Sequence, residues 1–322
     1  MKSTPLLKSL LLALGLSIGT AACAADYPAK PIRMIVANTA GGASDILARL
    51  ISGPMSESMG VPVIVENKPG AGQTIGTAEV ARAQPDGYTI LLATSSSHAI
   101  NPAVYKNLPY DALKDFAPVT TLALSEYALV VPSSAPHKTV ADLVASNKSK
   151  QLTFASNGNG TTSHLASALL AIRSSQEFIH VPYRSSSPAM TDLMGGQVDF
   201  LIDNTATAVQ NAQTGKLRIL ATSGAQRAAI TKDIPTMQEA GVPDYEVTGW
   251  WAVLAPAGTP KDIVERLNKE VAKAVAVPSV KETMSGMGND PVIKSPEETL
   301  AFIQGEMKKY GDIAKAINLQ ID

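Results

Sequence analysis

The sequence predicts an exported α/β protein of two domains, built on a mostly parallel sheet that helices cover. Three observations predict it. An apolar leader opens the chain, strand-like runs then alternate with helix-like runs, and the length of 322 residues exceeds the usual size of a single core. After the leader, no segment is apolar enough to span a bilayer. A formal net charge of −1 argues against nucleic acid as a partner.

Residues 1–25 have the pattern of a secretory signal peptide. Lys2 and Lys8 flank the start of a short apolar run, and the small residues "AACAA" follow it. We expect cleavage after Ala25 or one residue earlier, which removes Cys23, the only cysteine. A lipid anchor at Cys23 is disfavoured, because Thr20 stands where lipoprotein signals usually carry an apolar residue. The mature chain then forms no disulfide and offers no thiolate metal site.

The first third of the mature chain alternates strands and helices. Apolar runs predict strands at 32–37, 62–67 and 88–94, and helical spacing predicts helices at 45–59 and 77–84. In the first helix Leu47, Leu50 and Ile51 share one face, and Pro54 predicts a kink or an end. Asp45 falls in its first turn, where a negative charge suits the helix dipole.

The same alternation continues to the end of the chain. Strands are predicted at 126–132, 151–156, 177–183, 198–203 and 217–223, with a strand that runs into a turn over 249–260. Helices are predicted at 139–146, 165–172, 187–196, 261–276 and 296–317. Thr139 is the expected N-cap of the first of these. The clearest is 261–276, because its apolar residues recur at four-residue steps with charges between them.

Three of the predicted strands end in small polar residues just before a helix begins. These ends are "NTAGGASD" (38–45), "ATSSSHAINP" (93–102) and "ASNGNGTTSH" (155–164). A helix N-terminus has free N–H groups and a partial positive charge, so each end suits an anion or a carboxylate. Ordinary capping explains any one of them. Three together favour convergence at the carboxyl edges of the sheets, where α/β proteins bind ligands.

Several motifs for other chemistry are incomplete. "GAGQTIG" lacks the dinucleotide spacing, and "NGNGTTS" lacks the ending of a phosphate loop. The four histidines show no metal spacing, so we expect no metal and no cofactor. A Ser–His–Asp set could still assemble in the fold around His98 or His164. No G-x-S-x-G elbow is present, and packing or hydrogen bonding is the simpler role for His164.

Two further segments carry candidate binding residues. Tyr183 and Arg184 follow a predicted strand, and an Arg can pair bidentately with a carboxylate, although a solvated surface role is equally open. Asp203 ends another strand. It is a candidate helix cap, an acceptor for a ligand ammonium or hydroxyl, or a carboxylate beside the hinge. Trp250 and Trp251 are interpreted as a core or hinge pair.

Taken together, these segments resemble the extracytoplasmic solute receptors of the tripartite tricarboxylate transporter family, the Bug receptors. The resemblance is carried in order by "AGGASDILAR", "PVIVENKPGAGQTIGTAEVARAQPDGYTILLAT", "HVPYR", "PAMTDLMGGQVDF" and "IPTMQEAGVPDYEVTGWWAVLAPAGTP". It covers essentially the whole mature chain, and the "VENKPGAG" to "PDGYT" block is highly specific.

The resemblance implies a two-lobed type II periplasmic binding protein fold, each lobe a mixed sheet flanked by helices. Lobe one would take residues 26–124 and 247–322, and lobe two residues 125–246, with crossover strands near 126–132 and 248–256. It also implies a monomer without catalytic activity that closes on a small carboxylate in the periplasm. A two-component membrane permease, or a sensor protein in a signalling system, would recognise the closed form. An exported serine hydrolase is the enzymatic alternative.

The family's binding loops map onto seventeen residues here. They are Thr39, Ala40, Gly41, Gly42, Ser44, Ser95, Ser96, Ser156, Asn157, Gly158, Asn159, Gly160, Thr161, Thr162, Tyr183, Arg184 and Asp203. The chain departs from the family's usual pattern at Asn38 and Thr39, at Ser185 and Ser187, and at the two asparagines of "SNGNGTT". These departures add polar groups, so the sequence favours a hydroxylated or amino-bearing carboxylate.

Overall fold

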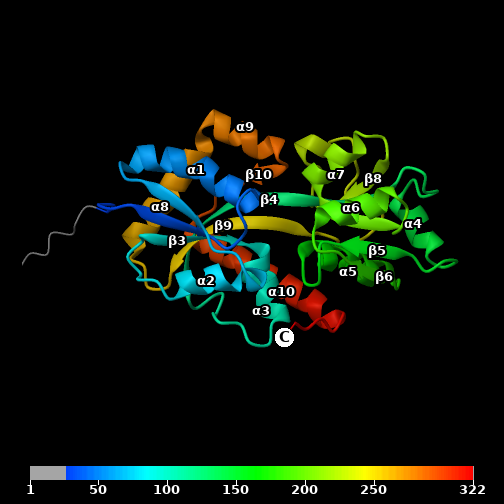
Figure 1. Ribbon diagram of the computed structural model, residues 1–322, viewed down its shortest axis with the longest axis horizontal. Coiled ribbons are helices and arrows are strands. Elements are labelled where there is room, and N and C mark those ends of the chain that lie inside the picture. The colour runs from blue at the N-terminus through cyan, green and yellow to red at the C-terminus, as the bar shows by residue number, and fades with distance from the viewer. Residues whose placement is uncertain (1–26, 322) are drawn as a thin grey trace, which may run out of the picture.

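The computed structural model describes residues 27–321, and the predicted signal peptide with Cys23 lies outside them. Two groups of helices and strands lie side by side along an elongated molecule, and two neighbouring strands link them at their junction (Figure 1). These strands are β4 (Phe116–Pro132) and β9 (Thr248–Pro256). We refer to the group that contains β1–β3 as lobe one and the group that contains β5–β8 as lobe two. The proposed boundaries at 124/125 and 246/247 remain predictions.

The strands form one path in the order β2-β1-β3-β9-β4-β7-β5-β6, with β10 and β8 paired to β4. In lobe one, β1 lies parallel to β2 and β3, and β3 lies antiparallel to β9. In lobe two, β5 lies parallel to β6 and β7. The other strand bounds are Ile32–Val36 (β1), Val63–Asn67 (β2), Thr89–Thr94 (β3), Thr153–Ser156 (β5), Ile179–Pro182 (β6), Phe200–Asn204 (β7), Leu217–Thr222 (β8) and Asn289–Pro291 (β10).

Helices follow most of the strands and cover the sheets (Figure 1). Lobe one has α1 (Ala43–Met59), α2 (Thr74–Ala81), α3 (Asn101–Val104), α8 (Lys261–Ala276), α9 (Pro278–Gly286) and α10 (Pro296–Ala316). Lobe two has α4 (Val140–Ser146), α5 (Thr162–Ser174), α6 (Ser186–Met194) and α7 (Thr205–Ala212). Short turns η2 (Ala71–Gln73), η3 (Ser96–Ile100) and η4 (Ala229–Thr231) complete the set. This mixed α/β architecture confirms the predicted fold class.

The apolar faces that the sequence predicts are buried. Leu267 and Val271 of α8 pack with Leu47 and Ile51 of α1 against one face of β1. A second core cluster runs across both lobes and includes Trp250 of β9. Burying each such side chain stabilises the fold by about 1.5–3 kcal/mol. Because the second cluster includes residues of both groups, the two lobes share part of their core.

The structure removes one of the predicted alternatives at Pro54, an end of the helix, and one at Asp203, a helix cap. The helix α1 continues through Pro54 to Met59, where Gly60 in the left-handed conformation caps it. Buried Ile51 and Met55 on either side of the proline hold this segment against the core. The side chain of Asn204, rather than Asp203, caps α7. The expected cap at Thr139 is present, as part of a capping box.

The long strand β4 was only partly predicted, and four further elements had no predicted range. The sequence predicts a strand at 126–132, whereas β4 begins at Phe116. Its first half pairs with β9 and β10, and its second half pairs with β7 and β8. No range was predicted for the helices α3, α7 and α9 or for the strand β10. Tertiary pairing therefore extends one strand through both lobes.

Candidate ligand cleft between the lobes

A cleft of about 940 Å³ opens between the two lobes. It has walls from α1 and the α9–β10 loop in lobe one, from β7 and α7 in lobe two, and from both crossover strands. None of the side chains that line it is a lysine or an arginine. Its lining residues are Gly41, Ala43, Ile46, Tyr127, Asn157, Ser186, Asp203, Asn204, Ala206, Thr207, Val209, Gln210, Gln213, Ile230, Trp251, Gly286, Met287 and Asn289.

The first predicted loop reaches the cleft through backbone atoms. Gly42 is the N-cap of α1, and no side chain caps this helix. Gly41 has φ +82°, which favours glycine, and its N–H donates to the Asp45 carboxylate at 2.9 Å. Gly41 and Ala43 line the cleft, so the first turn of α1 borders it. Thr39 and Ala40 are exposed beside this turn.

The second loop brings the lobes into contact with each other. The hydroxyls of Ser95, at the end of β3, and Thr162, at the start of α5, lie 3.4 Å apart, and both side chains are buried. Ser96 begins the π-helical turn η3 and is half-buried. Neither serine lines the cleft. This predicted strand end therefore contributes an interlobe contact.

The third loop uses most of its own polar groups. Thr161 caps α5 by accepting from the His164 N–H, and the Gly160 N–H donates to His164 Nδ1 at 3.2 Å. Ser156 is buried and bonds to His180 Nε2 at 2.6 Å. Asn157 lines the cleft, Gly158 is half-buried and Asn159 is exposed. Because Ser156 is buried, its pairing with a histidine presents no accessible nucleophile.

Asp203 is the charged residue of the cleft lining, and it is only 2% exposed. Its carboxylate accepts hydrogen bonds from Asn157 Nδ2 and the Asn204 N–H, both at 2.9 Å, and from the Ser186 hydroxyl. Burial raises the pKa of Asp203, and these three donors oppose the rise. The structure thus places a buried acceptor in the wall of lobe two.

Tyr183 and Arg184 lie outside the lining. The Tyr183 hydroxyl donates to Asp192 of α6 at 2.7 Å, and burial together with that carboxylate raises the pKa of Tyr183 to about 12. Arg184 is exposed. Of the seventeen predicted residues, the structure brings Gly41, Asn157 and Asp203 together on the cleft wall.

Fifteen lining residues were missing from the sequence prediction. Trp251 lines the cleft, and its indole N–H donates to the Ser44 hydroxyl at 2.9 Å. Predicted Ser44 is therefore buried as a support for this ring. Tyr127 of β4 and Asn289 of β10 come from the crossover strand and its partner. The polar residues that end "VDFLIDNTAT" could have indicated that α7 lines the cleft, but no local sequence pattern indicated β10.

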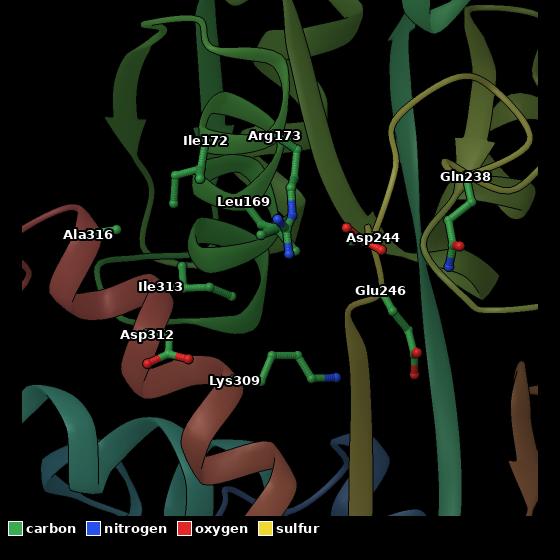
Figure 2. A pocket seen from close by; sticks show the side chains of 10 residues that line it. All are labelled: Leu169, Ile172, Arg173, Gln238, Asp244, Glu246, Lys309, Asp312, Ile313 and Ala316. Carbon is green, nitrogen blue, oxygen red and sulfur yellow. The ribbon is translucent and has the colours of Figure 1, made fainter.

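A second cavity of about 520 Å³ lies between α5 and α10 and contains none of the predicted residues. Figure 2 shows Arg173 on α5 and Lys309 on α10, with Lys309 extending toward Glu246. Leu169, Ile172 and Ile313 supply its apolar lining. It lies where α10 of lobe one packs beside α5 of lobe two. The interlobe cleft, which the predicted loops reach, is the better ligand candidate.

Two features of residues 27–321 bear on function. No group of three or more His, Cys, Asp or Glu side chains there is arranged to hold a metal ion. No helix in the same range has both the length and the apolar character to cross a bilayer.

Comparison with known protein families decides the class. Residues 47–319 match the model described as the tripartite tricarboxylate transporter family receptor. The chain belongs to this receptor family. A relative from Pseudomonas sp. strain P51, the UPF0065 protein in the tcbD-tcbE intergenic region, is 40% identical over 88% of this chain and 85% of its own. Protein BugT of Bordetella pertussis is 34% identical over 95% and 96%. The receptor is thus a Bug receptor.

Solved structures share the receptor's fold. One described as a periplasmic transporter has a TM-score of 0.79 at 38% identity, over 92% of this chain and 100% of its own. R. palustris Rpa4515, solved with adipate, has a TM-score of 0.80 at 34% identity over 92% and 99%. MatC from Rhodopseudomonas palustris, with bound malate, has a TM-score of 0.75 at 30% identity over 89% and 99%. The receptor is therefore a periplasmic solute-binding protein by family.

Proposed function

We propose that the receptor captures a small organic carboxylate by closing its lobes and delivers it to a two-component membrane permease. One observation carries the proposal: the first turn of α1 has no side-chain cap and borders the interlobe cleft through Gly41 and Ala43. Free N–H groups and the helix dipole favour a negative charge at that position. Relatives solved with adipate and with malate support the same ligand class.

The polar lining favours a ligand with its own hydrogen-bond donors. The Oδ1 atoms of Asn157 and Asn289 are buried and have no partner among the described residues, and Asp203 adds a buried carboxylate. Acceptors that stay unpaired after closure cost about 1–3 kcal/mol each. A hydroxylated or amino-bearing carboxylate would pair them, and a ligand without donors would be rejected.

Closure would supply selectivity without a catalytic step. Ligand between the lobes loses its water, which strengthens the hydrogen bonds that the cleft makes. Among the described strands, β4 pairs with β9 and β10 on the lobe-one side and with β7 and β8 on the lobe-two side, and the chain returns to lobe one through β9. Hinge motion at β4 and β9 is the expected closing movement.

A ligand panel tests the proposal. The purified receptor is heated with mono-, di- and tricarboxylates, hydroxy acids and amino acids. A ligand that binds only the folded state raises the melting temperature, so a panel in which nothing stabilises the receptor would refute carboxylate capture. Mass spectrometry of small molecules that co-purify identifies the natural ligand. Uptake of that ligand by a deletion strain separates transport from sensing, because a sensor leaves uptake unchanged.

A further inference from the structure

The two lobes meet at one edge of the cleft, where the α9–β10 loop faces lobe two. A Cβ atom on Gly288 would lie 3.1 Å from Cδ1 of Ile230 and 3.2 Å from Cβ of Ala206. Ile230 is 37% exposed and lines the cleft. We call this edge the seam, with Ala206 and residues 224–230 on its lobe-two side and residues 288–290 on its lobe-one side. Opening of the cleft at this edge must separate the seam.

Glu126 lies beside the seam, on the part of β4 that connects the lobes. It pairs with Thr248 in the ladder between β4 and β9. Gly224 packs so closely against the Glu126 carboxylate that a Cβ atom there would overlap it. The Ala228 N–H hydrogen-bonds to the same carboxylate. Glu126 therefore contacts the lobe-two side of the seam directly.

The surroundings of Glu126 disfavour its charge. Oε2 is buried with no hydrogen-bond partner among the described residues. Asp290, on the lobe-one side of the seam, adds a like charge. Arg227, the cation of the adjoining loop, instead pairs with Glu239 at 2.7 Å. Burial first, and Asp290 second, raise the pKa of Glu126 to about 7, while the Ala228 N–H opposes the rise.

We propose that Glu126 is a positioning residue for lobe closure, which in its neutral form keeps the seam together and on losing its proton loosens it. The ionised carboxylate has a lower free energy when it moves toward water and away from Asp290. That movement separates residues 224–228 from residues 288–290. This inference rests on the proposed function, because it assumes that ligand is held by closure.

The sign of the pH dependence follows from the raised pKa. An acid whose pKa is raised in the closed form stabilises that form below its ordinary pKa of 4.5. The stabilisation is lost as the pH rises toward about 7. Ligand affinity should therefore fall across this window, by roughly 30-fold between about pH 5.5 and about pH 8.

Calorimetric titration with the best ligand of the panel measures this effect. The comparison uses the wild-type receptor and Glu126→Gln, with Glu282→Gln, an exposed position on α9, as the matched control. We expect Glu126→Gln to bind equally tightly across the range, and Glu282→Gln to follow the wild type. Asp290→Asn should reduce the dependence, because it removes the like charge. Titration of the ligand itself affects all four proteins equally.

Coincident pH profiles for the wild type and Glu126→Gln would overturn the inference and leave carboxylate capture intact. If the panel yields no ligand, the proposed function fails, and small-angle scattering of the ligand-free proteins decides the inference alone. We expect the wild-type radius of gyration to increase between about pH 5.5 and about pH 8, and that of Glu126→Gln to stay constant. Equal behaviour of the two proteins would overturn it.

Discussion

Gly288→Ala provides a direct test of closure at the seam. The new Cβ would lie 3.1 Å from Cδ1 of Ile230, 3.2 Å from Cβ of Ala206 and 3.4 Å from the Ala206 nitrogen. The isoleucine tip can rotate away, but the Ala206 backbone at the start of α7 cannot move without shifting the helix. Gly288 also has φ +67°, which an alanine adopts at a cost of about 1 kcal/mol.

The cost of steric overlap and the cost of backbone strain can be separated by comparison with a second glycine of similar φ. Gly196 has φ +70° and no atom within 4 Å of an added Cβ. Gly196→Ala should therefore lower the free energy of unfolding by about 1 kcal/mol and leave ligand affinity unchanged. Gly288→Ala adds about 1–2 kcal/mol of overlap between the lobes. Since about 1.4 kcal/mol is tenfold, its affinity should be roughly 5- to 30-fold weaker.

Calorimetric titration gives the affinities, and denaturant unfolding gives the stabilities. The reasoning fails if Gly288→Ala binds ligand as tightly as Gly196→Ala does. Equal loss of affinity in both variants would show that backbone strain, and not interlobe contact, is responsible.

The remaining predictions concern the cleft and a stacked pair of histidines in lobe two. Gly42→Val should abolish measurable ligand binding. Its loss of stability should be small, because Gly42 has an ordinary φ of −81°. Gly53→Ala, in open space on the same helix, is its control in the same titration. Asp203→Asn should lower the affinity for an amino-bearing ligand about tenfold and leave the affinity for a plain dicarboxylate unchanged. Equal effects on both affinities would contradict a role of Asp203 as acceptor. His164 and His180 stack at 4.0 Å, and burial lowers both pKa values to about 4, so the unfolding free energy should fall as the pH drops from 6.5 toward 4. His180→Phe should flatten that fall, and an unchanged slope would exclude the pair as its cause.

The sequence by itself determined many of the local elements and the receptor family. Apolar residues at four-residue steps placed the helix at 261–276, which the structure has as α8 over the same residues. Thr139 was recognisable as a cap, since capping depends on residues within one turn. Glycines before a helix start indicated a backbone anion site at 38–45, and the quoted motifs indicated the receptor family.

Only the tertiary structure decided which polar groups remain available to a ligand. Ser44 supports Trp251, which is 207 positions away, Ser156 bonds to His180, and Ser95 contacts Thr162 of the other lobe. These partners come from distant segments, so no local pattern reveals them. The same holds for Asn289 and Glu126, whose surroundings form only when β4 pairs with β10. A strand end predicts donors and acceptors by composition, but packing determines which of them the fold itself already uses.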